Sequence, residues 1–95
     1  MNLADLPTPC LVLDRTILSR NIDAMAAALA HRAVPLRPHM KTAKCIEVAR
    51  LATAGQPGGI TVSTLAEAAY FFGHGITDIL YAVGITPRSW LGCAN

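Results

Sequence analysis

The sequence predicts an α/β fold, in the form of the amino-terminal portion of a parallel (β/α)8 TIM barrel with about three βα units. Two observations support this fold class. Segments typical of strands and of helices alternate along the chain, and the predicted strands start about 20 to 25 residues apart. Alternation at this spacing is typical of parallel strands that are joined by helical crossovers.

The length of the chain bears on how much of such a fold is present. A closed barrel of eight units needs about 250 residues, so the 95 residues are predicted to be one fragment, residues 1–95, of a larger domain. Three or four parallel strands with helices on one side would leave the other sheet face bare. The alternative is that the chain is complete and buries this face against a second copy of itself.

Composition excludes several classes of protein. Hydrophobic residues make up 53% of the chain and charged residues 15%, which predicts a globular chain and excludes a disordered tail. The net charge is +2 and the basic residues are scattered, apart from Arg37, Lys41 and Lys44, so we expect no nucleic-acid partner. No apolar run approaches the roughly 20 residues of a membrane span. Asp5 and the prolines near the amino terminus do not fit the pattern of a secretory signal, so none is predicted. The expected location is therefore the cytoplasm, with no membrane partner.

The first predicted strand is Cys10–Leu13, a short apolar run after two prolines. Asp14 follows it and can cap a helix. That helix is predicted because apolar residues recur at steps of three and four, which gives one apolar stripe. The stripe consists of Leu18, Ile22, Met25 and Leu29.

The second unit begins with an extended segment, Val34–His39. Pro35 and Pro38 lie inside it, and neither can donate a hydrogen bond to a neighbouring strand. Thr42 is the expected cap of the next helix, which ends at Gly55 and a turn rich in glycine and proline.

The third strand is Ile60–Ser63. Thr64 and Glu67 then have the spacing of a capping box, in which the two side chains each satisfy a free backbone donor at a helix start. The helix is predicted to run to about Phe72, and a fourth apolar strand follows at Ile79–Val83.

The chemistry is expected at the ends of the second and third strands. Alternate side chains of a strand share a face, so Arg37, His39 and Lys41 are predicted to point the same way. Three basic groups on an inward face require an anionic partner, because an unpaired buried charge is very unfavourable. A phosphorylated or carboxylated ligand would meet that need. Thr61 and Ser63, on the same face of the next strand, could donate hydrogen bonds to it.

Lys41 is the candidate for covalent chemistry. Lysine forms Schiff bases when desolvation or neighbouring cations leave part of it as free amine. An ordinary solvated lysine at the start of a loop is equally compatible with the spacing. Lys44 is expected in solvent or at most near a phosphate, and His39 gains interest only because it stands two residues before Lys41. Thr64 is first a helix cap, although the helix start that it caps could accept an anion.

A resemblance to a known family rests on three stretches of the sequence and one further residue: Thr8–Asp14, Asn21, Leu36–Thr42 with its Pro-His-Met-Lys-Thr motif, and Val62–Ala68. Over about residues 6–85, these resemble the D-threonine aldolase and D-serine dehydratase family. The family belongs to the alanine-racemase-like, fold-type III pyridoxal-phosphate enzymes. In one departure, Ala43 stands where the family often has histidine.

The resemblance implies pyridoxal 5'-phosphate as the cofactor, bound through a Schiff base on Lys41. The candidate cofactor-binding set is then Lys41, His39, Arg37, Ser63 and Thr64. The resemblance also implies a divalent metal, zinc or manganese, whose ligands lie in a carboxy-terminal β domain outside this chain. A small D-amino acid is the implied substrate, and a homodimer the implied full-length form.

The function implied is that of a fragment of a lyase for D-3-hydroxy amino acids, of the D-threonine aldolase or D-serine dehydratase type. Three alternatives stay open: an amino-acid racemase on the same scaffold, a pyridoxal-phosphate-binding protein without activity, and an inert fragment. The parent protein is expected to be an enzyme, and the 95 residues alone are expected to be incomplete.

Overall fold

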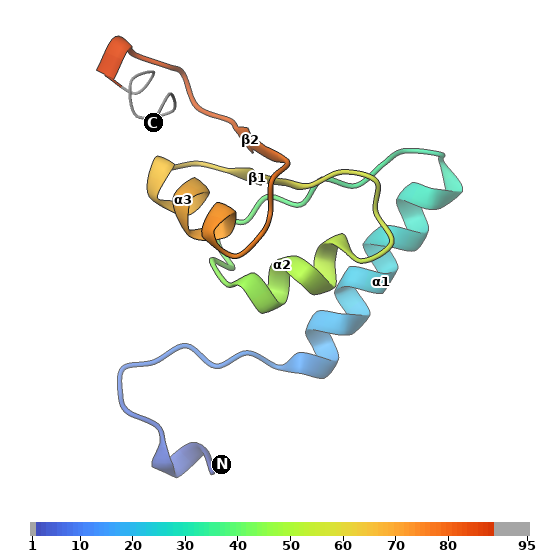
Figure 1. Ribbon diagram of the computed structural model, residues 1–95. Coiled ribbons are helices and arrows are strands. Elements are labelled where there is room, and N and C mark those ends of the chain that lie inside the picture. The colour runs from blue at the N-terminus through green and yellow to red at the C-terminus, as the bar shows by residue number, and fades with distance from the viewer. Residues whose placement is uncertain (1, 89–95) are drawn as a thin grey trace.

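A computed structural model describes residues 2–88 of the chain. Helices and strands alternate in its second half, as predicted. The elements in chain order are η1 Leu3–Asp5, α1 Arg15–His31, α2 Ile46–Thr53, β1 Ile60–Val62, α3 Leu65–Gly73 and β2 Ile79–Tyr81. Figure 1 shows that α2 and α3 lie on the same side of the two strands, and that α1 packs against α2.

The sheet of the described residues consists of β1 and β2, which pair in parallel with Ile60 opposite Ile79. The segment before α2 joins the other side of β1 through a parallel bridge between His39 and Thr61. Two backbone bonds of 2.9 Å, Met40 N–H to the Thr61 carbonyl and Thr61 N–H to the Pro38 carbonyl, hold this bridge. The predicted α/β class with parallel strands is thus confirmed, and the closed barrel stays a prediction.

Two of the predicted strands differ from the structure. Residues 10–13 are extended but belong to no strand, and the Leu11 side chain is fully exposed. An extended segment becomes a strand only when a neighbour takes its hydrogen bonds, and no segment of residues 2–88 does so here. The segment Val34–His39 is reduced to the bridge at His39, which agrees with the missing N–H groups of Pro35 and Pro38.

Helix starts follow the capping chemistry in two of three cases. The Asp14 carboxylate accepts from the Ile17 amide at 3.0 Å and begins α1. Thr42 does not cap α2, contrary to the prediction, because residues 43–45 are still irregular and the helix begins at Ile46. A group distant in sequence satisfies that helix start, since the Ile46 amide donates to the Tyr70 hydroxyl of α3 at 3.1 Å.

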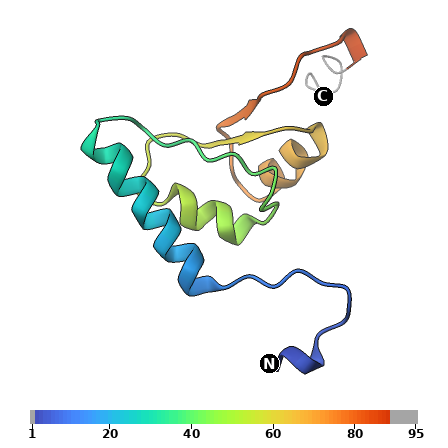
Figure 2. The same ribbon diagram turned by 180° about the vertical axis from the view of Figure 1, so that it is seen from behind.

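The core lies between the strands and the two helices α2 and α3 (Figures 1 and 2). Among the described residues, α1 contributes no fully buried side chain, although its Leu18 packs against the core. Seven hydrophobic residues within residues 2–88 are buried: Met40, Ile46, Val48, Ala49, Ile60, Val62 and Phe71. Ile60 and Val62 alternate along β1 and so share one face of it, which packs against the other core residues.

Candidate functional site

The residues that could carry chemistry gather where the parallel strands end. Lys41 lies two residues beyond the bridge at His39, and Ser63 directly follows β1. Parallel strands end at the same edge of a sheet, so these residues share the carboxyl edge. Lys41 and Ser63 each lie two residues beyond the His39–Thr61 bridge, where both segments bend. The structure therefore places both residues beyond the same end of this bridge.

The Lys41 side chain is exposed and has no hydrogen-bond or ion-pair partner within residues 2–88. Its backbone amide donates to Nδ1 of His39 at 3.1 Å. A ring nitrogen that accepts carries no proton, so neutral His39 has its proton on Nε2. The neighbouring Met40 is only 2% exposed. Met40 thus anchors the backbone in the core while His39 and Lys41 remain accessible, as the alternation predicted.

Arg37 lies at the opposite edge of the sheet. Its guanidinium forms an ion pair with Asp78 at 2.8 Å and donates to the Ile60 carbonyl at 2.9 Å. Asp78 immediately precedes β2 and Ile60 begins β1, so both contacts are at the amino ends of the strands. The inference that Arg37 requires an anionic ligand is therefore wrong, because Asp78 supplies the charge. Arg37 is four residues before Lys41, and four extended residues span about 13 Å. A role for Arg37 in cofactor binding stays a prediction.

Replacing Arg37 by methionine is expected to lower the free energy of unfolding by about 1 to 2 kcal/mol, since an exposed ion pair contributes little and the bond to the Ile60 carbonyl adds to it. Urea denaturation followed by circular dichroism measures the loss. Arg20→Met is the matched control, because Arg20 is exposed on α1. An equal loss in both variants would show that the Arg37–Asp78 contact contributes nothing.

Ser63, Thr64 and Glu67 form a hydrogen-bonded group at the start of α3. The Thr64 hydroxyl accepts from the Glu67 amide at 3.0 Å, which confirms Thr64 as the cap. The Ser63 hydroxyl donates to Oε2 of Glu67 at 2.9 Å. The pKa of Glu67 is lowered, and hydrogen bonding by the Thr64 side chain is the largest cause. The Ser63 hydroxyl and the charge of Lys44 also lower this pKa, whereas burial raises it. Glu67 is thus a carboxylate.

Glu67 is also the functional candidate that the sequence did not single out, since its spacing indicated only a helix cap. The side chain is 6% exposed, and its Oε1 atom has no hydrogen-bond partner among the described residues. It lines a pocket of about 270 Å³ at the start of α3. The lining consists of Lys44, Thr64, Ala66, Glu67, Tyr70 and Phe71.

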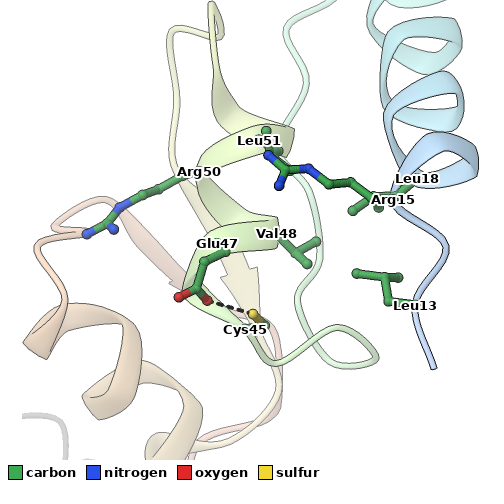
Figure 3. A pocket seen from close by; sticks show the side chains of 8 residues that line it. All are labelled: Leu13, Arg15, Leu18, Cys45, Glu47, Val48, Arg50 and Leu51. Carbon is green, nitrogen blue, oxygen red and sulfur yellow. Dashed lines mark hydrogen bonds between the residues drawn. The ribbon is translucent and has the colours of Figure 1, made fainter. Parts of the chain in front are cut away.

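A larger pocket, of about 620 Å³, lies between α1 and α2 (Figure 3). Its apolar lining includes Leu18 and Val48, and the Arg15 side chain reaches from α1 toward α2. The Cys45 thiol donates to Glu47 at 2.8 Å and is the main cause that lowers the pKa of this carboxyl group. This pocket is on the helix side of the sheet and contains none of the predicted site residues.

Neither a metal-ligand cluster nor a helix able to cross a membrane occurs within residues 2–88. No group of three or more histidine, cysteine, aspartate or glutamate side chains is arranged to hold a metal ion there. None of the helices in this range combines the length and hydropathy that a membrane crossing requires.

Comparison with known sequences finds relatives over most of the chain. The D-threo-3-hydroxyaspartate dehydratase of Delftia sp. strain HT23 is 48% identical over 86 residues, which are 90% of this chain and 23% of that enzyme. The D-serine dehydratase of Dictyostelium discoideum is 36% identical over 92% of the chain and 23% of its own length. The D-threonine aldolase of Arthrobacter sp. is 42% identical over 81% of the chain and 20% of its own length. No protein-family model matches the chain.

Solved structures agree with the sequence comparison. The structure of the Delftia dehydratase superposes with a TM-score of 0.89 at 44% identity, over 95% of this chain and 24% of the enzyme. A variant of the same enzyme in its metal-free form gives a TM-score of 0.88 at 45% identity. The chain therefore adopts the fold of a segment about one quarter as long as these enzymes.

Proposed function

Because the chain is a homologue of D-threonine aldolase, D-serine dehydratase and D-threo-3-hydroxyaspartate dehydratase over most of its length, we propose that it supplies the lysine-bearing edge of a lyase. The substrates of this lyase are D-3-hydroxy amino acids, and its cofactor is pyridoxal phosphate. The chain spans 23% of the length of the first of these relatives. The proposal therefore concerns the whole protein of which these residues form the site edge.

The observation that carries the proposal is the placement of Lys41. This lysine stands at the carboxyl edge of parallel strands, the edge at which α/β folds bind ligands. Its amine has no partner within residues 2–88, and the burial of Met40 fixes the backbone beside it. A lysine side chain without a partner, on an anchored backbone, fits the aldehyde group of the cofactor, with which a lysine forms a Schiff base.

The other residues of the edge support binding in different ways. His39 holds the Lys41 backbone through its Nδ1 atom. Thr64 begins α3, whose amino-terminal end carries the positive end of the helix dipole and favours a phosphate nearby. Pyridoxal phosphate, when bound, supplies the electron sink that stabilises negative charge on the substrate. We therefore assign Lys41 as the residue that would hold that cofactor.

The proposal extends to features of the whole protein. We infer a closed (β/α)8 barrel of which residues 1–95 form the first units, a divalent metal that binds elsewhere and polarises the substrate hydroxyl, a homodimer and a cytoplasmic location. For the reaction of the whole protein, we favour elimination or aldol cleavage over racemisation, because the relatives are named as dehydratases and aldolases.

Trapping with borohydride tests the role of Lys41. The chain is mixed with pyridoxal phosphate, reduced and digested, and mass spectrometry locates the added pyridoxyl group. We expect the label on Lys41 and at least a tenfold loss of label in Lys41→Arg, because arginine stays charged and cannot form the bond. Lys44→Arg is the matched control and should keep the label. Labelling chiefly at Lys44 or another lysine would contradict the proposal.

A further inference from the structure

Glu67 carries a buried charge of which one oxygen atom lacks a partner. Its side chain is 6% exposed, and its Oε2 atom accepts from the Ser63 hydroxyl at 2.9 Å. The Oε1 atom is buried as well and has no hydrogen-bond partner within residues 2–88. A buried carboxylate oxygen without a donor is unfavourable. A compensating group is therefore expected on the side of Oε1.

Two side chains of the pocket at the start of α3 have protons to offer. Lys44 and Tyr70 line this pocket of about 270 Å³ together with Glu67. The Tyr70 hydroxyl is uncharged and already accepts from the Ile46 amide at 3.1 Å. Lys44 has three donors and a full positive charge. It is therefore the lining residue that can supply both a donor and the opposite charge.

The electrostatics of Glu67 agree with this choice. Hydrogen bonding by Thr64 is the largest cause that lowers the pKa of Glu67, and Lys44 is the one residue whose charge also lowers it. The two groups form no direct ion pair among the described residues, so the attraction acts across the pocket. A pocket of this volume has room for a bridging water molecule. Because Lys44 is exposed, solvent screens part of the attraction.

We propose that the Lys44 ammonium group is the counter-charge of the buried Glu67 carboxylate, and that this pair ties the segment before α2 to the start of α3. Lys44 is then a positioning residue, because Lys41 lies three residues earlier on the same segment. The sequence left Lys44 between solvent and a phosphate contact. The proposal assigns its charge to a carboxylate of the chain itself, so that the phosphate of the proposed cofactor requires another partner.

A titration of Glu67 in the full chain tests the pair without any cofactor. The measured quantity is the pKa of Glu67, from carbon-13 NMR of its carboxyl carbon. A nearby positive charge favours the carboxylate, so this pKa should rise in Lys44→Met and stay close to its original value in Lys44→Arg, which keeps the charge. Lys41→Met is the matched control, because it removes an equal charge three residues away and should leave the Glu67 pKa nearly unchanged.

Two results of this titration would overturn the inference. One is a Glu67 pKa that does not respond to Lys44→Met, and the other is an equal rise in Lys41→Met. If the pKa rises in Tyr70→Phe and not in Lys44→Met, the tyrosine hydroxyl compensates Glu67 and Lys44 does not.

A double-mutant cycle measures the same coupling through stability. Lys44→Met, Glu67→Gln and the double variant are unfolded in urea at neutral pH and followed by circular dichroism. The effect of the double variant on the unfolding equilibrium constant should be smaller than the product of the two single effects, by about threefold or more. Strictly multiplicative effects would contradict the pair. The titration needs no substitution of Glu67 and decides the question if Glu67→Gln does not fold.

The consequence for the phosphate rests on the proposed function and is tested with two aldehydes. Pyridoxal phosphate and pyridoxal are each trapped by borohydride on the full chain, and the rate of Lys41 labelling is measured. The ratio of the two rates should be the same in Lys44→Met as in the unsubstituted chain. A loss in Lys44→Met with pyridoxal phosphate alone would identify Lys44 as a phosphate contact and overturn the assignment. Absence of label on Lys41 in the unsubstituted chain would overturn the proposed function, whereas the titration of Glu67 decides the pair.

Discussion

Replacing Gly59 by alanine is expected to separate the starts of β1 and β2 and to cost more than about 3 kcal/mol of unfolding free energy. A Cβ atom at Gly59 would overlap the backbone carbonyl oxygen of Asp78 and lie 2.7 Å from its carbonyl carbon. The same carbonyl oxygen accepts from the Ile60 amide at 3.0 Å. Backbone atoms cannot rotate away as a side chain could, so relief of the overlap requires that the two strands move apart.

Gly73→Ala is the matched control for this prediction. Gly73 ends α3, and a Cβ atom there would have no atom within 4 Å apart from its chain neighbours and the backbone of its own helix. Alanine is also the better helix former, so this variant should be neutral or slightly more stable. Urea denaturation followed by circular dichroism compares the two. If Gly59→Ala unfolds at the same urea concentration as Gly73→Ala, the close approach of residues 59 and 78 does not exist in solution.

Local chemistry explains why the sequence predicted the helices well. Asp14 and Thr64 cap α1 and α3 through side-chain contacts with residues only three positions away. Such contacts depend on spacing alone and are visible in the sequence. The start of α2 was wrong by several residues because its amide partner is Tyr70, 24 positions away. Spacing carries no information about a partner at that distance.

Strands were harder to predict for the same reason. The apolar run of residues 10–13 has the composition of a strand, yet no segment of the described chain pairs with it. Alternation along residues 37–41 correctly separated the buried Met40 from the accessible His39 and Lys41. It could not separate Arg37 from Lys41, because the partner of Arg37 is Asp78, which is 41 positions away.

The candidate site was predictable from the sequence only in part. The second and third predicted strand segments did prove to be neighbours, because His39 pairs with Thr61 in parallel. The direction of hydrogen bonding was not predictable. It depends on Glu67, whose spacing from Thr64 indicated a cap and whose carboxylate instead accepts from Ser63.

The second large effect is expected at Phe71, which is fully buried, while its neighbour Phe72 is 64% exposed. Phe71→Ala should cost about 3 to 5 kcal/mol of unfolding free energy, through lost transfer energy and a cavity. Phe72→Ala removes the same atoms from the same helix and should cost less than about 0.5 kcal/mol, because most of that ring already contacts water. Urea denaturation of the two variants measures the difference directly.

Loss of Phe71 should also reach the candidate site. Its ring packs edge-on against Tyr70 at a centroid distance of 4.9 Å, and the Tyr70 hydroxyl holds the start of α2. Phe71 shares the core with Met40, the residue next to Lys41. Phe71→Ala should therefore reduce labelling of Lys41 under conditions where the variant is still folded, and Phe72→Ala should not. Equal labelling in both would mean that the core does not position Lys41, and that the bridge at His39 is sufficient to hold it.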